Sequence, residues 1–113
     1  MEISNRPVIV RERDTTPFLE GDELCRLYVS TGKITFGTSS LQPGQHGAVD
    51  TGHPNSHEVF FCIHGHVLIH TEGQEFVELY EGDAVVIPEG LPHTLFNVGE
   101  TPAFVSWSAG PTP

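Results

Sequence analysis

Short apolar or alternating runs, separated by turn residues, recur along the whole chain. Two clear examples are 59–65 (VFFCIHG) and 66–73 (HVLIHTEG), which are rich in Val, Ile and Phe and end at glycine. Such runs, with Gly, Pro or Asp between them, are typical of β-strands. The pattern predicts about eight or nine strands. We place them at 8–13, 25–30, 33–41, 59–65, 66–73, 76–83, 84–88, 93–99 and 103–110.

Helical periodicity is nearly absent from the sequence. No segment keeps apolar residues three and four positions apart over several turns, so we expect at most one helical turn, around 15–21. Many short strands joined by tight turns favour an all-β sandwich or barrel. The length of 113 residues suits one domain, 1–113, with a hydrophobic core of its own.

The chain is strongly acidic, with 15 Asp and Glu against 5 Lys and Arg and a net charge of −10. A phosphate backbone or an anionic membrane would be repelled, so we expect neither nucleic acid nor membrane as a partner. No apolar run approaches the ~20 residues of a membrane helix, and the N-terminus lacks the apolar core of a signal peptide. These features predict a cytoplasmic protein. Its cysteines, Cys25 and Cys62, lack metal-site spacing, and a disulfide between them stays open as an alternative.

One segment, GDAVVIPEGLPHTLFN, combines an apolar run, a Pro/Gly turn and a histidine that begins the next run. This order places one imidazole at the mouth of a β-fold. The spacing resembles the second signature of the cupin superfamily, G-x5-P-x-G-x2-H-x3-N. All of its named positions are filled here, by Gly82, Pro88, Gly90, His93 and Asn97.

A second segment resembles the first cupin signature, G-x5-H-x-H-x3-4-E-x6-G, in part. Glu58 and Gly65 have the required separation, and His53 stands where the second histidine belongs. The slot of the first histidine holds Thr51, and Gly44 is one residue too far from that slot. The two signatures together cover about residues 44–97.

The resemblance implies a double-stranded β-helix, or jelly roll, of two packed antiparallel sheets. It also implies that His53, Glu58 and His93 meet inside the barrel as ligands of a divalent transition metal. Two imidazoles and one carboxylate suit Fe(II), and the set also admits Mn, Ni or Zn. A fourth ligand is left open among His46, Asp50 and water.

The function implied is a metal-dependent small-molecule enzyme of lyase, isomerase, cyclase or dioxygenase type. The alternative is a metal-free module that binds a sugar or another small molecule, which a hydrogen bond from Thr51 to His53 or Glu58 in a dry pocket would favour. Relatives commonly form homodimers, sometimes by exchange of an N-terminal strand, and residues 6–13 are the candidate here. Other chemistries have no support, since the chain holds no G-x-S-x-G, P-loop, GxGxxG or paired CxxC.

The remaining histidines are expected outside the site. His57 and His64 are predicted to be exposed, whereas His66 and His70 share an outward face with Leu68. Asn97 is expected to hold a backbone turn instead of touching substrate. Candidate walls of a pocket are Tyr28, Phe36, Phe60, Ile69, Val86, Leu95, Phe104 and Trp107.

Overall fold

Residues 1–73 and 75–113 are described by a computed structural model, and they form nine strands and one short 3-10 helix, η1 (Glu12–Asp14). The prediction of an all-β fold is confirmed, because every strand pairing is antiparallel and helix is confined to η1. The strands are β1 (Phe18–Glu20), β2 (Glu23–Ser30), β3 (Thr35–Leu41), β4 (His57–His64), β5 (His66–Thr71), β6 (Phe76–Tyr80), β7 (Ala84–Ile87), β8 (His93–Asn97) and β9 (Ala103–Gly110).

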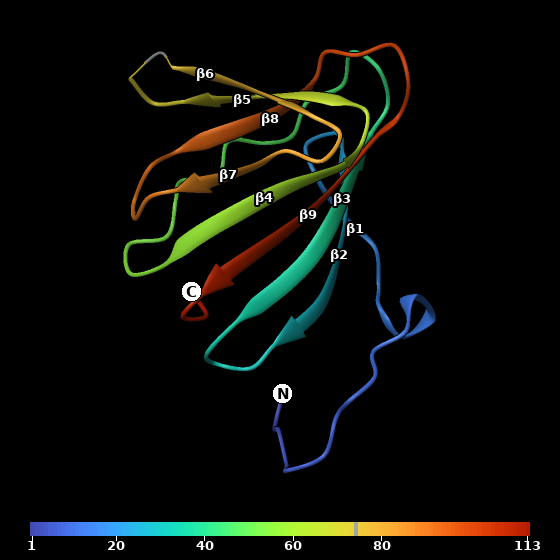
Figure 1. Cartoon of the computed structure of the whole chain (residues 1–113), viewed down its shortest axis with the longest axis vertical. Helices are drawn as coiled ribbons and strands as arrows, with labels where there is room; N and C mark the ends of the chain where they lie inside the picture. The colour runs from blue at the N-terminus through green and yellow to red at the C-terminus, as the bar shows by residue number, and fades with distance from the viewer. Residues whose placement is uncertain (74) are drawn as a thin grey trace.

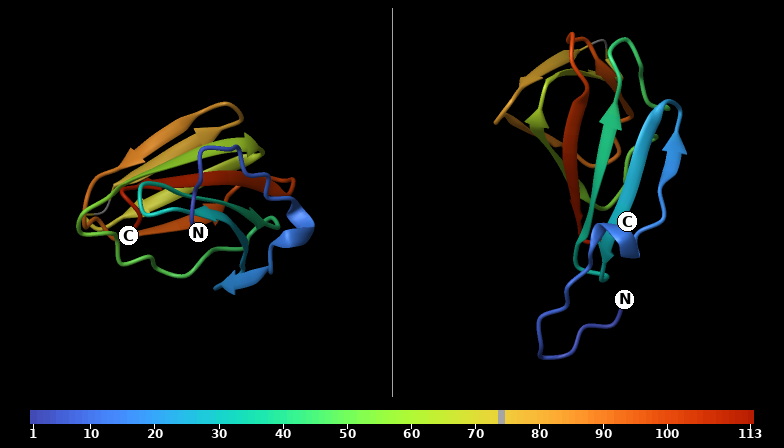
Figure 2. Two further views of the ribbon diagram at one scale, coloured as in Figure 1. Left: turned by 90° about the horizontal axis from the view of Figure 1, so that it is seen from below. Right: turned by 90° about the vertical axis from the view of Figure 1, so that its right-hand side faces the viewer.

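The strands form two sheets (Figure 1). The larger has the order β1-β2-β3-β9-β4-β7 and the smaller the order β6-β5-β8. Figure 2 shows the two sheets from two further sides. Strands that are far apart in the sequence, such as β3 and β9, lie side by side, so the two ends of the chain help to build one sheet.

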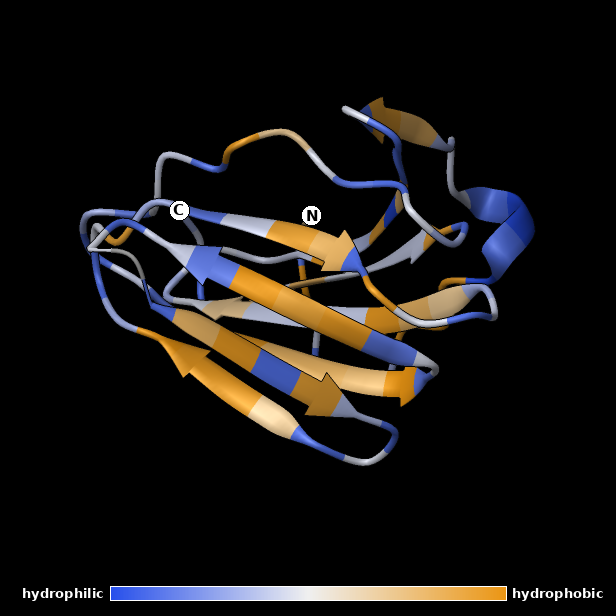
Figure 3. Ribbon diagram, turned by 90° about the horizontal axis from the view of Figure 1, so that it is seen from above, coloured by the Kyte–Doolittle hydropathy of each residue, from blue (hydrophilic) through white to orange (hydrophobic). Residues whose placement is uncertain are grey.

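The core lies between the sheets, and in β4 and β5 buried residues alternate strictly with less buried ones. In β4 every second residue from Glu58 to Cys62 is buried, and in β5 the buried positions are Val67, Ile69 and Thr71. Side chains of a strand point alternately to its two faces, so one face of each strand enters the core. Figure 3 shows continuous hydrophobic runs along several strands, with hydrophilic residues at many strand ends. The core residues are Leu41, Phe60, Cys62, Val67, Ile69, Leu79, Ile87, Leu95, Ala103 and Val105.

The N-terminal segment differs from the prediction. Residues 8–13 do not form a strand, and η1 takes up the end of that stretch instead. The helical turn expected around 15–21 is also wrong, because β1 lies there and pairs with β2. A strand needs a partner, and β1 already occupies the edge of the sheet beside β2. The residues before η1 therefore form an arm outside the sheets, with Ile9 71% exposed (Figure 1).

Cys25 and Cys62 are both free and buried, so the alternative of a disulfide does not hold. Cys62 lies in the core as a small apolar residue, and Cys25 lies on β2. Within the described part of the chain, no helix has the length and apolar character needed to cross a membrane.

Candidate metal centre

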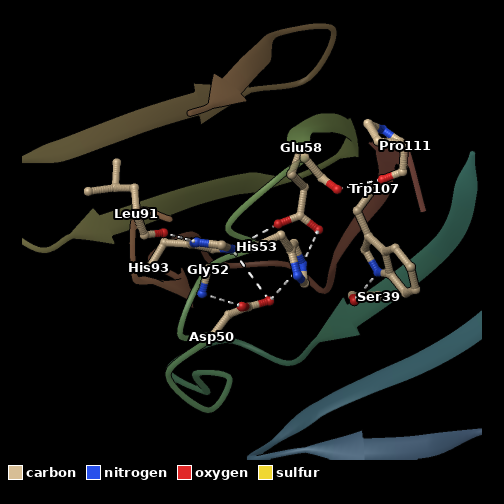
Figure 4. A network of polar contacts seen from close by, with 10 residues as sticks. Ser39, Asp50, Gly52, His53, Glu58, Leu91, His93, Trp107 and Pro111 are labelled. Carbon is tan, nitrogen blue, oxygen red and sulfur yellow. Dashed lines mark hydrogen bonds and ion pairs between the residues drawn. The ribbon is translucent and has the colours of Figure 1, made fainter. Parts of the chain in front are cut away.

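Four polar side chains from three parts of the chain converge between the sheets (Figure 4). Glu58 comes from β4 and His93 from the start of β8. Asp50 and His53 come from the long connection between β3 and β4. Glu58 and His93 are 5% and 4% exposed, which is exceptional for a charged residue and requires a partner of opposite charge or a metal.

The connection between β3 and β4 is held against β8 like an irregular extra strand. Gly47 N donates to Leu95 O at 2.8 Å, and Asp50 and His93 exchange both backbone hydrogen bonds at 2.8 and 2.9 Å. Residues that exchange both bonds in an antiparallel pair present their side chains on the same face. The Asp50 carboxylate therefore lies beside the His93 imidazole on the inner face.

Gly52 lets this connection pass close to the turn before β8. Its φ is +87°, and a Cβ there would stand 2.8 Å from Gly90 C and Leu91 N. Gly90 N donates to His53 O at 2.9 Å, which fixes the same contact from the other side. Gly52 N also donates to Asp50 Oδ1 at 2.8 Å. One carboxylate oxygen is thus held by the backbone, and Oδ2 is left to face the histidines.

The ligand-type atoms of the four residues lie close together. His93 Nε2 is 3.0 Å from Glu58 Oε1 and 3.7 Å from Asp50 Oδ2. His53 Nε2 is 3.8 Å from Asp50 Oδ2 and 3.9 Å from Glu58 Oε2. One atom each from Asp50, Glu58 and His93 fall within 4.8 Å of one another, a spacing that one metal ion can bridge.

The hydrogen bond on the far side of His93 sets which nitrogen faces this cluster. His93 Nδ1 lies 2.9 Å from Leu91 O, a carbonyl that can only accept, so Nδ1 carries the proton. In the neutral ring, Nε2 then presents a lone pair toward Glu58 Oε1. Both atoms are buried and find no hydrogen-bond partner among the described residues. Two buried acceptors at contact distance call for a cation between them.

The charges and hydrogen-bond acceptors near His93 also favour positive charge at this position. Burial lowers the pKa of His93, because the charged imidazolium loses hydration. The neighbouring Glu58 carboxylate, the Leu91 carbonyl and the charge of Asp50 outweigh that effect, so the pKa of His93 is raised overall. The electrostatic environment at Nε2 therefore favours positive charge.

A cavity of about 380 Å³ opens onto the four residues. Of the candidate walls, Phe60, Leu95 and Trp107 line it. Ile69 belongs to the core instead, and Val86 is 58% exposed. The other three candidates also lie elsewhere: Tyr28 and Phe36 form an edge-to-face pair at 6.2 Å, and Phe104 is 39% exposed.

The other histidines lie away from the cluster, as predicted. The side chains of His57 and His64 are 66% and 60% exposed. His66 and His70 are on the outer face of the smaller sheet, stacked on Tyr80 and Phe76 respectively. His46, one of the three options for a fourth ligand, is also placed elsewhere: its ring stacks on Phe96 at 5.3 Å.

Of the three options for a fourth group, the structure brings Asp50 into the cluster. Thr51 is exposed, and among the described residues its side chain makes no hydrogen bond to His53 or Glu58. A signal for Asp50 exists in the sequence, because five residues separate Gly44 from Asp50, as the first signature requires before its first histidine. One extra residue between Asp50 and His53 hides this match, because counting back from Glu58 leads to Thr51.

Comparison with known proteins finds one family model and one curated relative that match this chain. A family model described as a cupin domain matches residues 37–108. The quercetin 2,3-dioxygenase of Bacillus subtilis is 32% identical over 92 residues, which cover 78% of this chain and 27% of that protein. The chain therefore spans about a quarter of the length of this curated relative.

Solved structures share the fold at low sequence identity. A predicted oxalate decarboxylase from Thermotoga maritima superposes with a TM-score of 0.77 at 20% identity, covering 91% of this chain and 98% of that one. The Fe(II) form of HppE superposes with a TM-score of 0.82 at 12% identity, covering 96% of this chain and 62% of that one. These likenesses confirm the predicted double-stranded β-helix. The family model extends over more than half of the chain, from β3 into β9, so this protein belongs to the cupin domain family.

Proposed function

We propose that this protein is a metal-dependent enzyme that acts on a small molecule, with Asp50, His53, Glu58 and His93 as the ligands of a divalent transition metal. One observation carries the proposal. His93 Nε2 and Glu58 Oε1 are buried 3.0 Å apart without a hydrogen-bond partner among the described residues, and they face a cavity. A metal ion placed there would satisfy both atoms, whereas in a metal-free site a proton on Nε2 would have to do so.

The residues present fit such an ion. Two imidazoles and two carboxylates suit Fe(II), Mn, Ni or Zn, and four ligands leave coordination positions free on an octahedral ion. The Leu91 carbonyl orients His93, and Gly52 N orients Asp50, so two of the four groups are held by backbone bonds. A bound ion would polarise a substrate oxygen as a Lewis acid.

The rest of the cavity would hold and shield the substrate. Phe60, Leu95 and Trp107 supply apolar wall beside the polar cluster. Such walls exclude water and raise the strength of every electrostatic contact made inside. The volume of about 380 Å³ fits a small molecule and is too small for a folded protein segment.

Metal content tests the proposal directly. Protein purified without an affinity tag would be analysed by plasma mass spectrometry, together with the Glu58→Ala and His93→Ala variants. We expect about one equivalent of a transition metal in the parent and loss of metal in both variants. A parent that stays metal-free after reconstitution would contradict the proposal and favour the metal-free binding module, which small-molecule binding screens would then address.

The reaction class depends on the metal that supports turnover. A dioxygenase, as the Bacillus relative is named, would require O₂ together with its metal, and an iron-dependent one would require Fe(II). A lyase, isomerase or cyclase would also work with Ni, Mn or Zn and without O₂. Turnover of a substrate library by protein reconstituted with each metal, with and without oxygen, separates these classes.

We also propose that the protein forms a homodimer and that it is located in the cytoplasm. The support for the dimer is the exposed apolar surface of the N-terminal arm, where Ile3, Val8 and Ile9 are more than half exposed. Light scattering of the full chain and of Ile9→Asp would test it: we expect a dimer for the parent and a weaker dimer for the variant. A parent that is a monomer would contradict the dimer. Cell fractionation checks the location.

A further inference from the structure

A second polar cluster lies at the cavity, separate from the four candidate metal ligands. Glu23 and Cys25 on β2 and Trp107 on β9 line the cavity, and Ser39 on β3 lies behind them. Trp107 Nε1 donates to Ser39 Oγ at 2.8 Å, and Cys25 Sγ lies 3.4 Å from the same oxygen. Ser39 is 1% exposed, so its hydroxyl is a buried group that Trp107 and Cys25 both contact. Its own proton remains free to point toward Cys25 or the Glu23 carboxyl.

The Glu23 carboxyl occupies space that is free only because Gly47 has no side chain. A Cβ on Gly47 would collide with Glu23 Oε2. Gly47 itself is fixed from both sides, because Gly47 N donates to Leu95 O and Ala48 N donates to Glu20 O. The backbone thus leaves a slot that the carboxyl fills. Glu23 lines the same cavity as Asp50, His53, Glu58 and His93.

The surroundings favour the protonated form of this carboxyl. Burial raises the pKa of Glu23, a hydrogen bond from Ser39 works against that, and the charges of Glu20, Glu58 and Asp50 raise it further. The other titratable groups lining this cavity are Cys25, His53 and His93. A bound dication would offset the charges of Asp50 and Glu58, but burial, the largest cause, would persist in the metal-loaded protein.

We propose that Glu23 is a substrate-binding residue, which donates a hydrogen bond to an oxygen atom of a small substrate with an apolar ring, whose other oxygen atoms face the four candidate metal ligands. The inference deepens the proposed metal-dependent function and rests on it. The cavity has polar groups in two clusters, with Phe60, Leu95 and Trp107 among its apolar walls. A small molecule with an apolar ring and oxygen substituents at separate positions matches these two clusters.

The test uses two probes that differ in one acceptor group. 4-Nitrocatechol has two adjacent hydroxyls for the metal and a nitro group across the ring, whereas catechol lacks the nitro group. Zn²⁺-loaded protein would be titrated with 4-nitrocatechol, whose visible spectrum shifts on metal coordination, and catechol would be measured by displacement. The metal content of every variant is measured first.

We expect Glu23→Leu to retain the metal and to weaken 4-nitrocatechol binding about tenfold, while catechol binding changes less than about twofold. Glu23→Gln keeps a donor and should stay within about threefold of the parent. Gly47→Ala should repeat the loss seen in Glu23→Leu, because it displaces the carboxyl without changing its chemistry. Glu100→Gln, on the exposed loop after β8, is the matched control.

The pH dependence separates binding from a structural role. The ratio of parent to Glu23→Gln affinity cancels the probe's own ionisation. We expect this ratio to fall as the pH is raised, because Glu23 then loses the proton that it donates, and its raised pKa places this loss above the pH at which an ordinary Glu titrates. Equal weakening of both probes in Glu23→Leu, no weakening at all, or no spectral shift in the loaded parent would overturn the inference while leaving the metal site standing. A parent protein that holds no metal would contradict both the proposed function and this inference.

Discussion

Asp50 and His93 lie opposite each other and exchange both of their backbone hydrogen bonds, although Asp50 belongs to no strand. This isolated bridge carries the long β3–β4 connection onto β8 and places a carboxylate beside an imidazole. The centre is therefore built from one strand of each sheet and one loop. Changes in the loop should act on the metal as strongly as changes in the strands.

The first prediction concerns the identity of the fourth ligand. Asp50→Asn should weaken binding of Zn²⁺ at least about tenfold, because a charged ligand atom is lost while the shape is kept. Thr51→Ala should leave the affinity unchanged, since the Thr51 side chain is exposed. Isothermal titration calorimetry measures both. Equal losses in the two variants would mean that the loop, and not the Asp50 carboxylate, is what matters.

The second prediction separates ligand loss from unfolding. His93→Ala should bind no transition metal and yet keep the circular dichroism spectrum of the parent, because the substitution leaves the backbone hydrogen bonds between residue 93 and Asp50 in place. His66→Ala is the control: it removes a histidine from the outer face, where the ring stacks on Tyr80 at 4.2 Å. Metal loss in His66→Ala would show that the faces of β5 had been assigned the wrong way round.

The third prediction concerns the close approach at Gly52. Gly52→Ala should lower the free energy of unfolding by about 2 kcal/mol or more, because φ is positive and the new Cβ meets backbone atoms. It should also weaken metal binding by moving Asp50 and His53. Gly32→Ala is a matched control, because its φ is also positive but a Cβ there meets nothing within 4 Å. Urea unfolding gives the free energy of unfolding of both variants. Gly32→Ala reports the backbone strain alone, and Gly52→Ala reports the strain together with the collision.

The fourth prediction follows from the role of Asn97, where the expectation of a turn-holding residue is confirmed. Its Nδ2 donates to Leu41 O and Thr101 O, and its Oδ1 accepts from Gly99 N, all at 2.9 Å. Asn97→Ala should cost about 2–4 kcal/mol of stability, because these buried backbone groups lose their partner. Exposed Asn55 provides the control, and Asn55→Ala should change the urea midpoint little. Retained stability in Asn97→Ala would contradict this role.

The fifth prediction concerns the thiol of Cys25. Burial raises the pKa of Cys25 to about 11, so the reactive thiolate is scarce at neutral pH. In the folded protein its alkylation by iodoacetamide should be slow near pH 7 and rise about tenfold per pH unit up to that pKa. Mass spectrometry of peptides reads out the modification, with urea-unfolded protein as the control. Rapid labelling of native Cys25 at neutral pH would be inconsistent with this environment.

Most of the fold follows from local pattern. Alternation and turn residues predicted the strands that became β2 to β9, because side chains on a strand alternate and each strand has one buried face. The two predictions that failed concern 8–13, which runs into η1, and 15–21, which follows it. Whether either segment forms a strand depends on whether a sheet edge is free beside it. Edge pairing is a tertiary property, so a β-rich composition alone could not place β1.

The candidate site divides in the same way. The spacing of His93 and Glu58 within their signatures, and the alternation along their strands, were enough to aim both side chains inward. Asp50 was one of three options, and only the tertiary structure shows that its carboxylate lies in the cluster while His46 does not. The reason is physical: the position of a loop residue depends on which backbone groups it pairs with. Here those groups belong to His93, a residue far away in the sequence, and to the glycine that lets the loop approach it.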